Sequence, residues 1–181
     1  DLDLMLAAGV RMIRLFSSDD KVARQTLQVI ADNNLNMKVQ LGAFIRGDAY
    51  AAEADKPAIY AGNEASIAQA IALANNPAFK DIILAVSIGN ETQVDFSGVR
   101  TRPETLAAYL RTVRSQITQP VTTDDNWLAW ARMPAVITSP MAKRLLAPAP
   151  KASSSGSTPS TVAKVVIRIG RSRNAAASST A

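Results

Sequence analysis

The sequence predicts an α/β fold in which parallel strands alternate with helices. Short apolar runs of strand length recur along the chain, and segments with helical periodicity separate them. Strands joined by single helices become parallel neighbours through right-handed crossovers. Polar residues follow the apolar runs one after another, as in a barrel that assembles its active site at the carboxyl ends of its strands. A doubly wound open sheet and part of a (β/α)8 TIM barrel both satisfy this order, and we expect the barrel.

Residues that begin or end regular structure bound the predicted elements. Gly9 is placed to end the first helix, and Ser17 or Ser18, followed by Asp19 and Asp20, supplies capping groups for the second. Pro77 closes the third helix, and Pro103 opens the fourth at a position where proline is welcome. In chain order the expected elements are helix 3–8, strand 12–16, a helix ending near residue 33, strand 37–42, helix 58–75, strand 82–86, helix 103–117 and a short strand from residue 120.

The third predicted strand is the most informative segment of the chain. Its run from Ile82 to Val86 is apolar throughout, as in a strand buried on both faces. Gly89, Asn90 and Glu91 follow where the strand leaves the sheet. A carboxylate at that place is either a catalytic group or a solvated loop residue, and the local pattern alone leaves both interpretations open.

The composition limits the chemistry that is available. The 181 residues include no cysteine and no histidine, so acid–base catalysis would fall to Asp, Glu, Lys or Tyr. Neither of the glycine-rich nucleotide-binding motifs occurs, and we expect no cofactor and no metal. No apolar stretch reaches the ~18 residues of a membrane span. The chain begins without Met and in the middle of a helical pattern, which indicates a fragment, so its first residues say nothing about export.

Charge divides the sequence into two parts. Residues 1–130 contain 12 basic and 15 acidic residues, whereas residues 131–181 contain 8 basic residues and no acidic one. The second part is rich in Ala, Ser and Pro, so we expect a disordered basic tail after a folded domain at 1–130. The tail lacks aromatic residues, and we expect no nucleic-acid partner.

Four segments together resemble the bacterial branch of glycoside hydrolase family 17, the β-1,3-glucanases and glucan-remodelling transferases. The segments are Ile13–Asp19, Val39–Gly42, Val86–Glu91 and Val121–Trp127, and the resemblance covers about residues 1–130. It implies strands 2–5 of a TIM barrel that hydrolyses or transfers β-1,3-glucan with retention of configuration. It also implies a β-glucan oligosaccharide or polysaccharide as partner, and a secreted, periplasmic or cell-envelope location.

The resemblance assigns roles to two residues. In the family, the glutamate of the Asn-Glu pair is the general acid/base, which here is Glu91. Asn90 would then hydrogen-bond the sugar ring beside the scissile bond. The alternative for Asn90 is a residue that tolerates turn geometry.

Further candidates for substrate binding come from the strand ends. Arg14 either belongs to the substrate site or forms a structural ion pair, because a buried guanidinium is costly when unpaired. Asp124 and Asn126 either line the cleft or cap a helix. Trp127 is either a sugar-stacking platform or a residue packed under a loop.

The sequence departs from the family pattern in its last third. A retaining glycosidase needs a second carboxylate, which in the family comes from a later strand, but no Glu follows Glu104 and no Asp follows Asp125. We expect a frameshift or misplaced gene end near residue 130, and a chain that is inactive alone. A non-catalytic glucan-binding remnant and a non-functional truncated product are the alternatives. Part of a barrel also leaves open sheet edges, through which we expect self-association.

Overall fold

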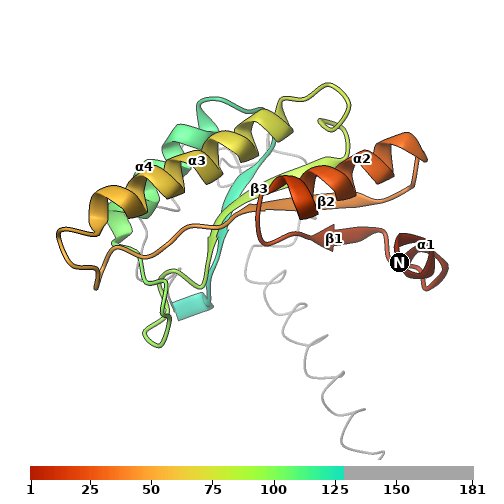
Figure 1. Ribbon diagram of the computed structural model, residues 1–181. Helices are drawn as coiled ribbons and strands as arrows, with labels where there is room; N and C mark the ends of the chain where they lie inside the picture. The colour runs from red at the N-terminus through yellow and green to blue at the C-terminus, as the bar shows by residue number, and fades with distance from the viewer. Residues whose placement is uncertain (129–181) are drawn as a thin grey trace, which may run out of the picture. The chain divides into compact units, whose positions relative to one another are not determined.

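A parallel sheet of four strands, in the order β1-β2-β3-β4, forms the centre of the protein (Figure 1). The structure is a computed structural model that describes residues 1–128, so the predicted basic tail lies outside the described residues. The strands are β1 (Met12–Arg14), β2 (Lys38–Ala43), β3 (Ile83–Asn90) and β4 (Val121–Asp124). The helical elements are α1 (Leu2–Ala7), the π-helical turn η1 (Asp20–Arg24), α2 (Gln25–Asp32), α3 (Lys56–Ala74) and α4 (Pro103–Arg114). The predicted α/β class is confirmed, and the sheet is compatible with part of a TIM-barrel-like fold.

The helices α2, α3 and α4 pack on one face of the sheet and build the core there (Figure 1). Strand side chains alternate between the two faces, so every second residue of β2 points into this layer. The buried residues of the layer include Val39 and Leu41 of β2, Val86 and Ile88 of β3, Leu27 and Ile30 of α2, Ile67 and Leu73 of α3, and Leu106 and Leu110 of α4. The opposite face carries the polar strand residues, among them Gln40 between Val39 and Leu41.

Strand β1 ends at Arg14, two residues earlier than predicted. The chain still follows β2 there, because Leu15 N donates to Gln40 O over 3.0 Å. Leu15 and Phe16 lie close against Gly42: a Cβ added to Gly42 would lie 2.8 Å from the carbonyl carbon and oxygen of Phe16 and nearer still to Leu15 O. Glycine is therefore needed at Gly42 because backbone atoms occupy the space of a side chain.

The second predicted helix begins with a π-helical turn that its sequence pattern does not show. Of the predicted capping residues, Asp19 is the N-cap, and its side chain accepts a hydrogen bond from Val22 N at 2.8 Å. The carbonyl oxygen of Asp19 accepts from both Ala23 N and Arg24 N, at 2.9 and 3.3 Å. The second of these bonds spans five residues, which widens the first turn before α2 continues with regular geometry.

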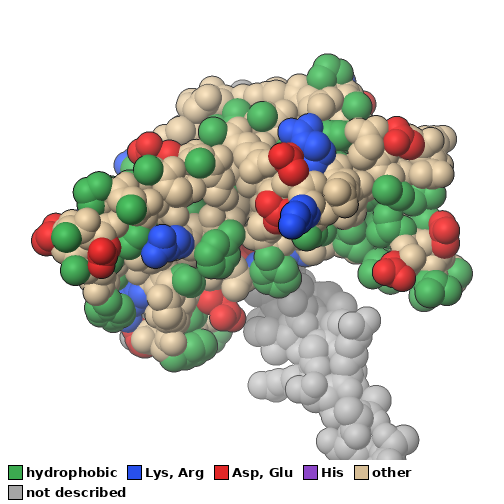
Figure 2. Space-filling view, in the orientation of Figure 1, with side chains coloured by type: hydrophobic (Ala, Val, Ile, Leu, Met, Phe, Trp, Pro, Cys, Tyr) green, Lys and Arg blue, Asp and Glu red, His purple; other side chains and the backbone are tan. Residues whose placement is uncertain are grey.

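Helix α1 packs less tightly than the other helices. None of its residues is buried, and Leu4 and Met5 are exposed. Figure 2 shows hydrophobic and acidic side chains of this helix at the right of the molecule. Within residues 1–128 no helix is both long and apolar enough to cross a membrane.

Candidate functional site

A network of polar side chains joins all four strands on the sheet face opposite the helices. This strand-end network consists of Arg14 of β1, Gln40 of β2, Ser87 and Asn90 of β3, and Asp124 of β4. Arg14 Nη2 lies 3.0 Å from Asp124 Oδ2 and donates to Asn90 Oδ1 over 2.5 Å. Gln40 Nε2 donates to the two carboxylate oxygens of Asp124 over 3.0 and 3.1 Å, and Ser87 Oγ donates to Oδ2. Asp124 is therefore the acceptor that holds the network together.

The contacts within the strand-end network decide which of its groups are left to a ligand. Asp124 uses both carboxylate oxygens on side chains of its own chain, so its main role is to hold them in place. Asn90 uses its carbonyl oxygen for Arg14, which leaves Nδ2 as the group that can donate to a ligand. The guanidinium of Arg14 also lies 4.4 Å from the ring centroid of Phe16, which is a cation–π contact.

The backbone has an unusual conformation on both sides of Asn90, where β3 leaves the sheet. Gly89 and Glu91 on either side of it have φ of 76° and 51°, both in the left-handed region. A non-glycine residue costs about 1 kcal/mol in that region. The pairing of β3 with β4 changes register between Ser87 and Asn90, and Glu91 N then donates to Asp124 O over 2.7 Å. This geometry leaves the Glu91 side chain exposed at the carboxyl edge, beside the strand-end network.

Asp125 fastens the residues that follow Glu91 to the end of β4. Its carboxylate accepts from Gln93 N at 3.0 Å and from Thr92 Oγ1 at 3.1 Å. Burial raises the pKa of Asp125, and these hydrogen bonds oppose the rise. Thr92 is fully buried beneath the turn, where its Cγ2 would lie 2.6 Å from a Cβ added to Gly89. The segment that carries Glu91 is thus held on both sides.

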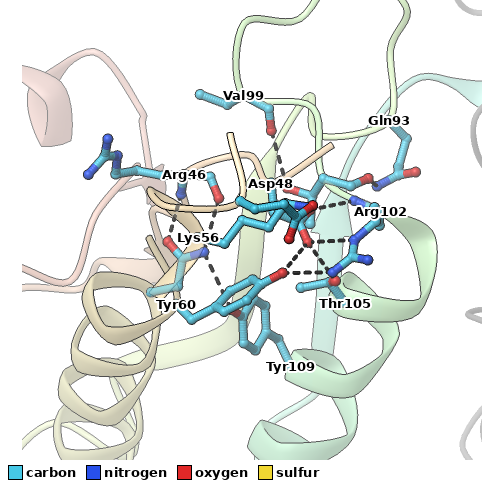
Figure 3. Close-up of polar contacts among 12 residues, drawn as sticks. Arg46, Asp48, Lys56, Tyr60, Gln93, Val99, Arg102, Thr105 and Tyr109 are labelled. Atoms are coloured by element: carbon cyan, nitrogen blue, oxygen red, sulfur yellow. Dashed lines mark hydrogen bonds and ion pairs between the residues drawn. The ribbon is translucent and has the colours of Figure 1, made fainter. Parts of the chain in front are cut away.

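A second polar cluster joins the loop after β2 to the start of α4 (Figure 3). This Asp48 cluster consists of Asp48, Tyr60, Arg102 and Thr105. The Asp48 side chain is 0% exposed and accepts from Arg102 N, Arg102 Nε and Thr105 Oγ1 at 2.8, 2.9 and 2.9 Å, and from Tyr60 Oη at 3.1 Å. Four donors compensate for the burial of its charge.

Asn63 of α3 holds the same loop from the other side. This buried side chain accepts from Arg46 N at 2.7 Å and donates to Arg46 O at 3.0 Å. Two helices, α3 and α4, thereby fix the position of the loop after β2 through polar side chains (Figure 3).

The structure brings several of the predicted site residues together. Arg14, Asn90 and Asp124 are in direct contact, and Glu91 follows Asn90 at the same edge. Arg14 takes Asp124 as its ion-pair partner, one of the two possibilities left open for it. Asn126 and Trp127 follow β4, and Trp127 is exposed rather than packed under a loop. The roles of these residues toward a sugar stay predictions.

Three residues that matter for the geometry are missing from the predicted site. Gln40 and Ser87 lie in the strands that the resemblance identified, and each faces the side opposite the helices. Alternation along β2 was a usable signal for Gln40, because this polar residue separates the apolar Val39 and Leu41. Nothing in the local sequence marks Asp48 as buried. Among residues 1–128 no cluster of three or more acidic side chains is arranged to hold a metal ion.

Comparison with known proteins identifies a fold neighbour. Neither a protein-family model nor a curated protein sequence matches the chain. Among solved structures, an endo-laminarinase from Formosa Hel1_33_131 is similar, with a TM-score of 0.57 and 19% sequence identity over 72% of this chain and 36% of that chain. At this identity the similarity shows the fold alone. The chain spans only about a third of the length of that enzyme.

Proposed function

We propose that the chain is part of a β-1,3-glucan-active glycoside hydrolase of the retaining type, with Glu91 as general acid/base. The observation that carries the proposal is the backbone around Asn90. Left-handed residues on both sides direct Asn90 to Arg14 and leave Glu91 exposed at the carboxyl edge of the sheet. Strained backbone at the end of a parallel strand is typical of functional sites. The fold similarity to an endo-laminarinase and the resemblance of four segments to family 17 support the substrate class.

The proposed chemistry follows from the groups at this edge. Glu91 protonates the glycosidic oxygen as the bond from that oxygen to the anomeric carbon breaks and a second carboxylate bonds to the anomeric carbon. Asn90 Nδ2 donates to a hydroxyl of the sugar ring, while Arg14 and Asp124 hold Asn90 in position. Retention requires a second carboxylate about 5–5.5 Å from the first. No Glu follows Glu104, no Asp follows Asp125, and the Asp124 carboxylate is engaged by Arg14, Gln40 and Ser87, so we expect the chain alone to bind glucan without turning it over.

An external nucleophile tests the role of Glu91 independently of the missing carboxylate. Azide forms a bond to the anomeric carbon while the glycosidic bond breaks and Glu91 gives its proton to the leaving oxygen. We expect the purified chain to form α-glycosyl azide from a laminari-oligosaccharide, and Glu91→Gln to form at least about 100-fold less, since general acids contribute 10²–10⁴. Mass spectrometry of the products measures the yield.

Glu104 provides a matched control, because it is an exposed glutamate in the first turn of α4. Glu104→Gln should form as much azide product as the unchanged chain. Equal product from Glu91→Gln would overturn the assignment. Binding of laminarin without product under any condition would identify a non-catalytic glucan-binding remnant, and absence of binding would identify a non-functional truncated product.

The edges of the described sheet lead to a proposal on assembly. Within residues 1–128, β1 and β4 each pair with one strand only. Open edges of parallel sheets offer unpaired backbone groups to other chains. We therefore expect self-association that increases with concentration, measured by light scattering after size exclusion. A monomer at every concentration, with a sharp reversible melt, would contradict this expectation.

A further inference from the structure

Exposed aromatic side chains occur at only one edge of the described sheet. Among residues 1–128 they are Phe16, Phe44, Tyr50, Phe96 and Trp127. All five follow the carboxyl ends of strands, in the segments that lead away from the edge where Glu91 lies. The other described aromatic residues, Tyr60, Phe79 and Tyr109, are buried or half-buried. Large exposed rings confined to one edge indicate a contact surface, because water solvates them poorly.

Two of the most exposed rings, Tyr50 and Phe96, lie on two loops that are joined to each other. The loop between β2 and α3 and the loop between β3 and α4 share a backbone hydrogen bond, from Ala49 N to Arg100 O at 3.1 Å. A Cβ on Gly47 would overlap the backbone of Val99 and Arg100, so the two loops touch along their backbones. The Asp48 cluster adds its hydrogen bonds beneath them (Figure 3). These contacts fix the two loops to each other.

The joined loops present two aromatic rings to solvent. Tyr50 is 75% exposed and Phe96 is 82% exposed. The guanidinium of Arg100 lies 6.0 Å from the Tyr50 ring centroid and is itself held by Asp95, with Nη1 2.6 Å from Oδ1. In Figure 2 hydrophobic side chains lie among acidic and basic ones over this lower-left part of the molecule. Rings next to fixed polar groups suit a ligand that has both apolar faces and hydroxyl groups.

We infer that Tyr50 and Phe96 form a distal stacking surface for a β-1,3-glucan chain whose nearer sugars lie at Glu91. This inference rests on the proposed function and extends it from a single cleavage point to an extended substrate. Phe96 is five residues from Glu91, so their Cα atoms are at most about 18 Å apart, a distance that several linked sugars span. Because the two loops are already joined through their backbones, little backbone freedom is lost when a ligand binds, which favours affinity.

The dependence of affinity on oligosaccharide length tests the inference. Titration calorimetry compares laminaribiose with laminarihexaose on the full chain. Tyr50→Ala and Phe96→Ala should each weaken hexaose binding about 3- to 10-fold and leave biose binding unchanged. This fold-change corresponds to the stacking contribution of one aromatic ring, since a tenfold change in affinity equals 1.4 kcal/mol. Tyr50→Phe keeps the ring and should bind hexaose as the unchanged chain does.

Leu4 of α1 is the control for loss of an exposed hydrophobic side chain, and Leu4→Ala should bind both sugars normally. The inference of a distal surface fails if the Ala variants lose biose and hexaose binding equally, or if their hexaose binding is unchanged. Neither outcome affects the azide test of Glu91. If the Ala variants instead lose only self-association, the rings contact another copy of the chain and the inference fails. Failure of the unchanged chain to bind any β-1,3-glucan would overturn both proposals.

Discussion

A Gly42→Ala variant is expected to lose much of its stability. The added methyl group would meet the backbone of Leu15 and Phe16, where no side-chain rotation relieves the overlap. The segment after β1 must then move away from β2, and Arg14 moves with it from Asp124. Overpacking costs 1–3 kcal/mol when side chains can adjust. Against backbone we expect about 3 kcal/mol or more, a large part of the 5–15 kcal/mol of a typical domain. Urea unfolding followed by circular dichroism measures the change.

Gly62 is the matched control, because it lies in α3 and a Cβ added there meets no atom within 4 Å. Gly62→Ala should leave stability unchanged or raise it by up to about 1 kcal/mol, since alanine favours helix. A Gly42→Ala protein that unfolds at the same urea concentration as the unchanged chain would show that β1 does not lie against β2 as described.

An Asp48→Ala variant should be destabilised by about 3 kcal/mol, because it leaves the donors of a fully buried carboxylate without an acceptor. The loss should be greatest in the loops that the Asp48 cluster joins, so hydrogen exchange should accelerate at residues 44–55 and 91–102. Asp95→Ala is the comparison, since it removes an exposed carboxylate paired with Arg100 and should leave the unfolding curve almost unchanged. Equal unfolding curves for the two variants would contradict the structural role of Asp48.

The Asp48 carboxylate also makes the free energy of unfolding depend on pH. Burial by itself would raise the pKa of Asp48, but hydrogen bonds from Arg102, Thr105 and Tyr60 outweigh it and hold the pKa below its usual value. The pKa of Asp48 in the folded state is lower than the unfolded value near 3.9, so its ionised form stabilises the fold. This stabilisation is complete above about pH 5 and is lost as the pH falls through the folded pKa. Asp48→Asn does not titrate and should lose less stability than the unchanged chain over that acidic range.

The elements of the fold could be predicted because their signals are local. The apolar run Ile82–Val86 marked β3, the segment 37–42 marked β2, and the capping residues around Asp19, together with Pro103, marked the starts of the second and fourth helices, as found. The strand-end network could be predicted only in part. That Arg14 and Asp124 lie at one edge follows from parallel strands, but their direct contact depends on the register of three successive strand pairs, including two shifts.

Other features depend on contacts between segments that are distant in the sequence. Asp48 is buried because its donors come from α3 and from the start of α4, and no pattern around Asp48 contains that information. The need for glycine at Gly42 likewise arises from the backbone of residues 15 and 16. The left-handed conformation of Glu91 has no sequence signal, since glutamate is not a residue that favours it.

The order of the strands has a consequence for synthesis on the ribosome. Each strand pairs with the one before it, so every strand that emerges finds the edge it needs already made. Pairing between consecutive strands brings together residues that are close in the sequence, which favours rapid folding. The described residues can therefore fold progressively from the amino terminus, at the rate at which translation delivers them.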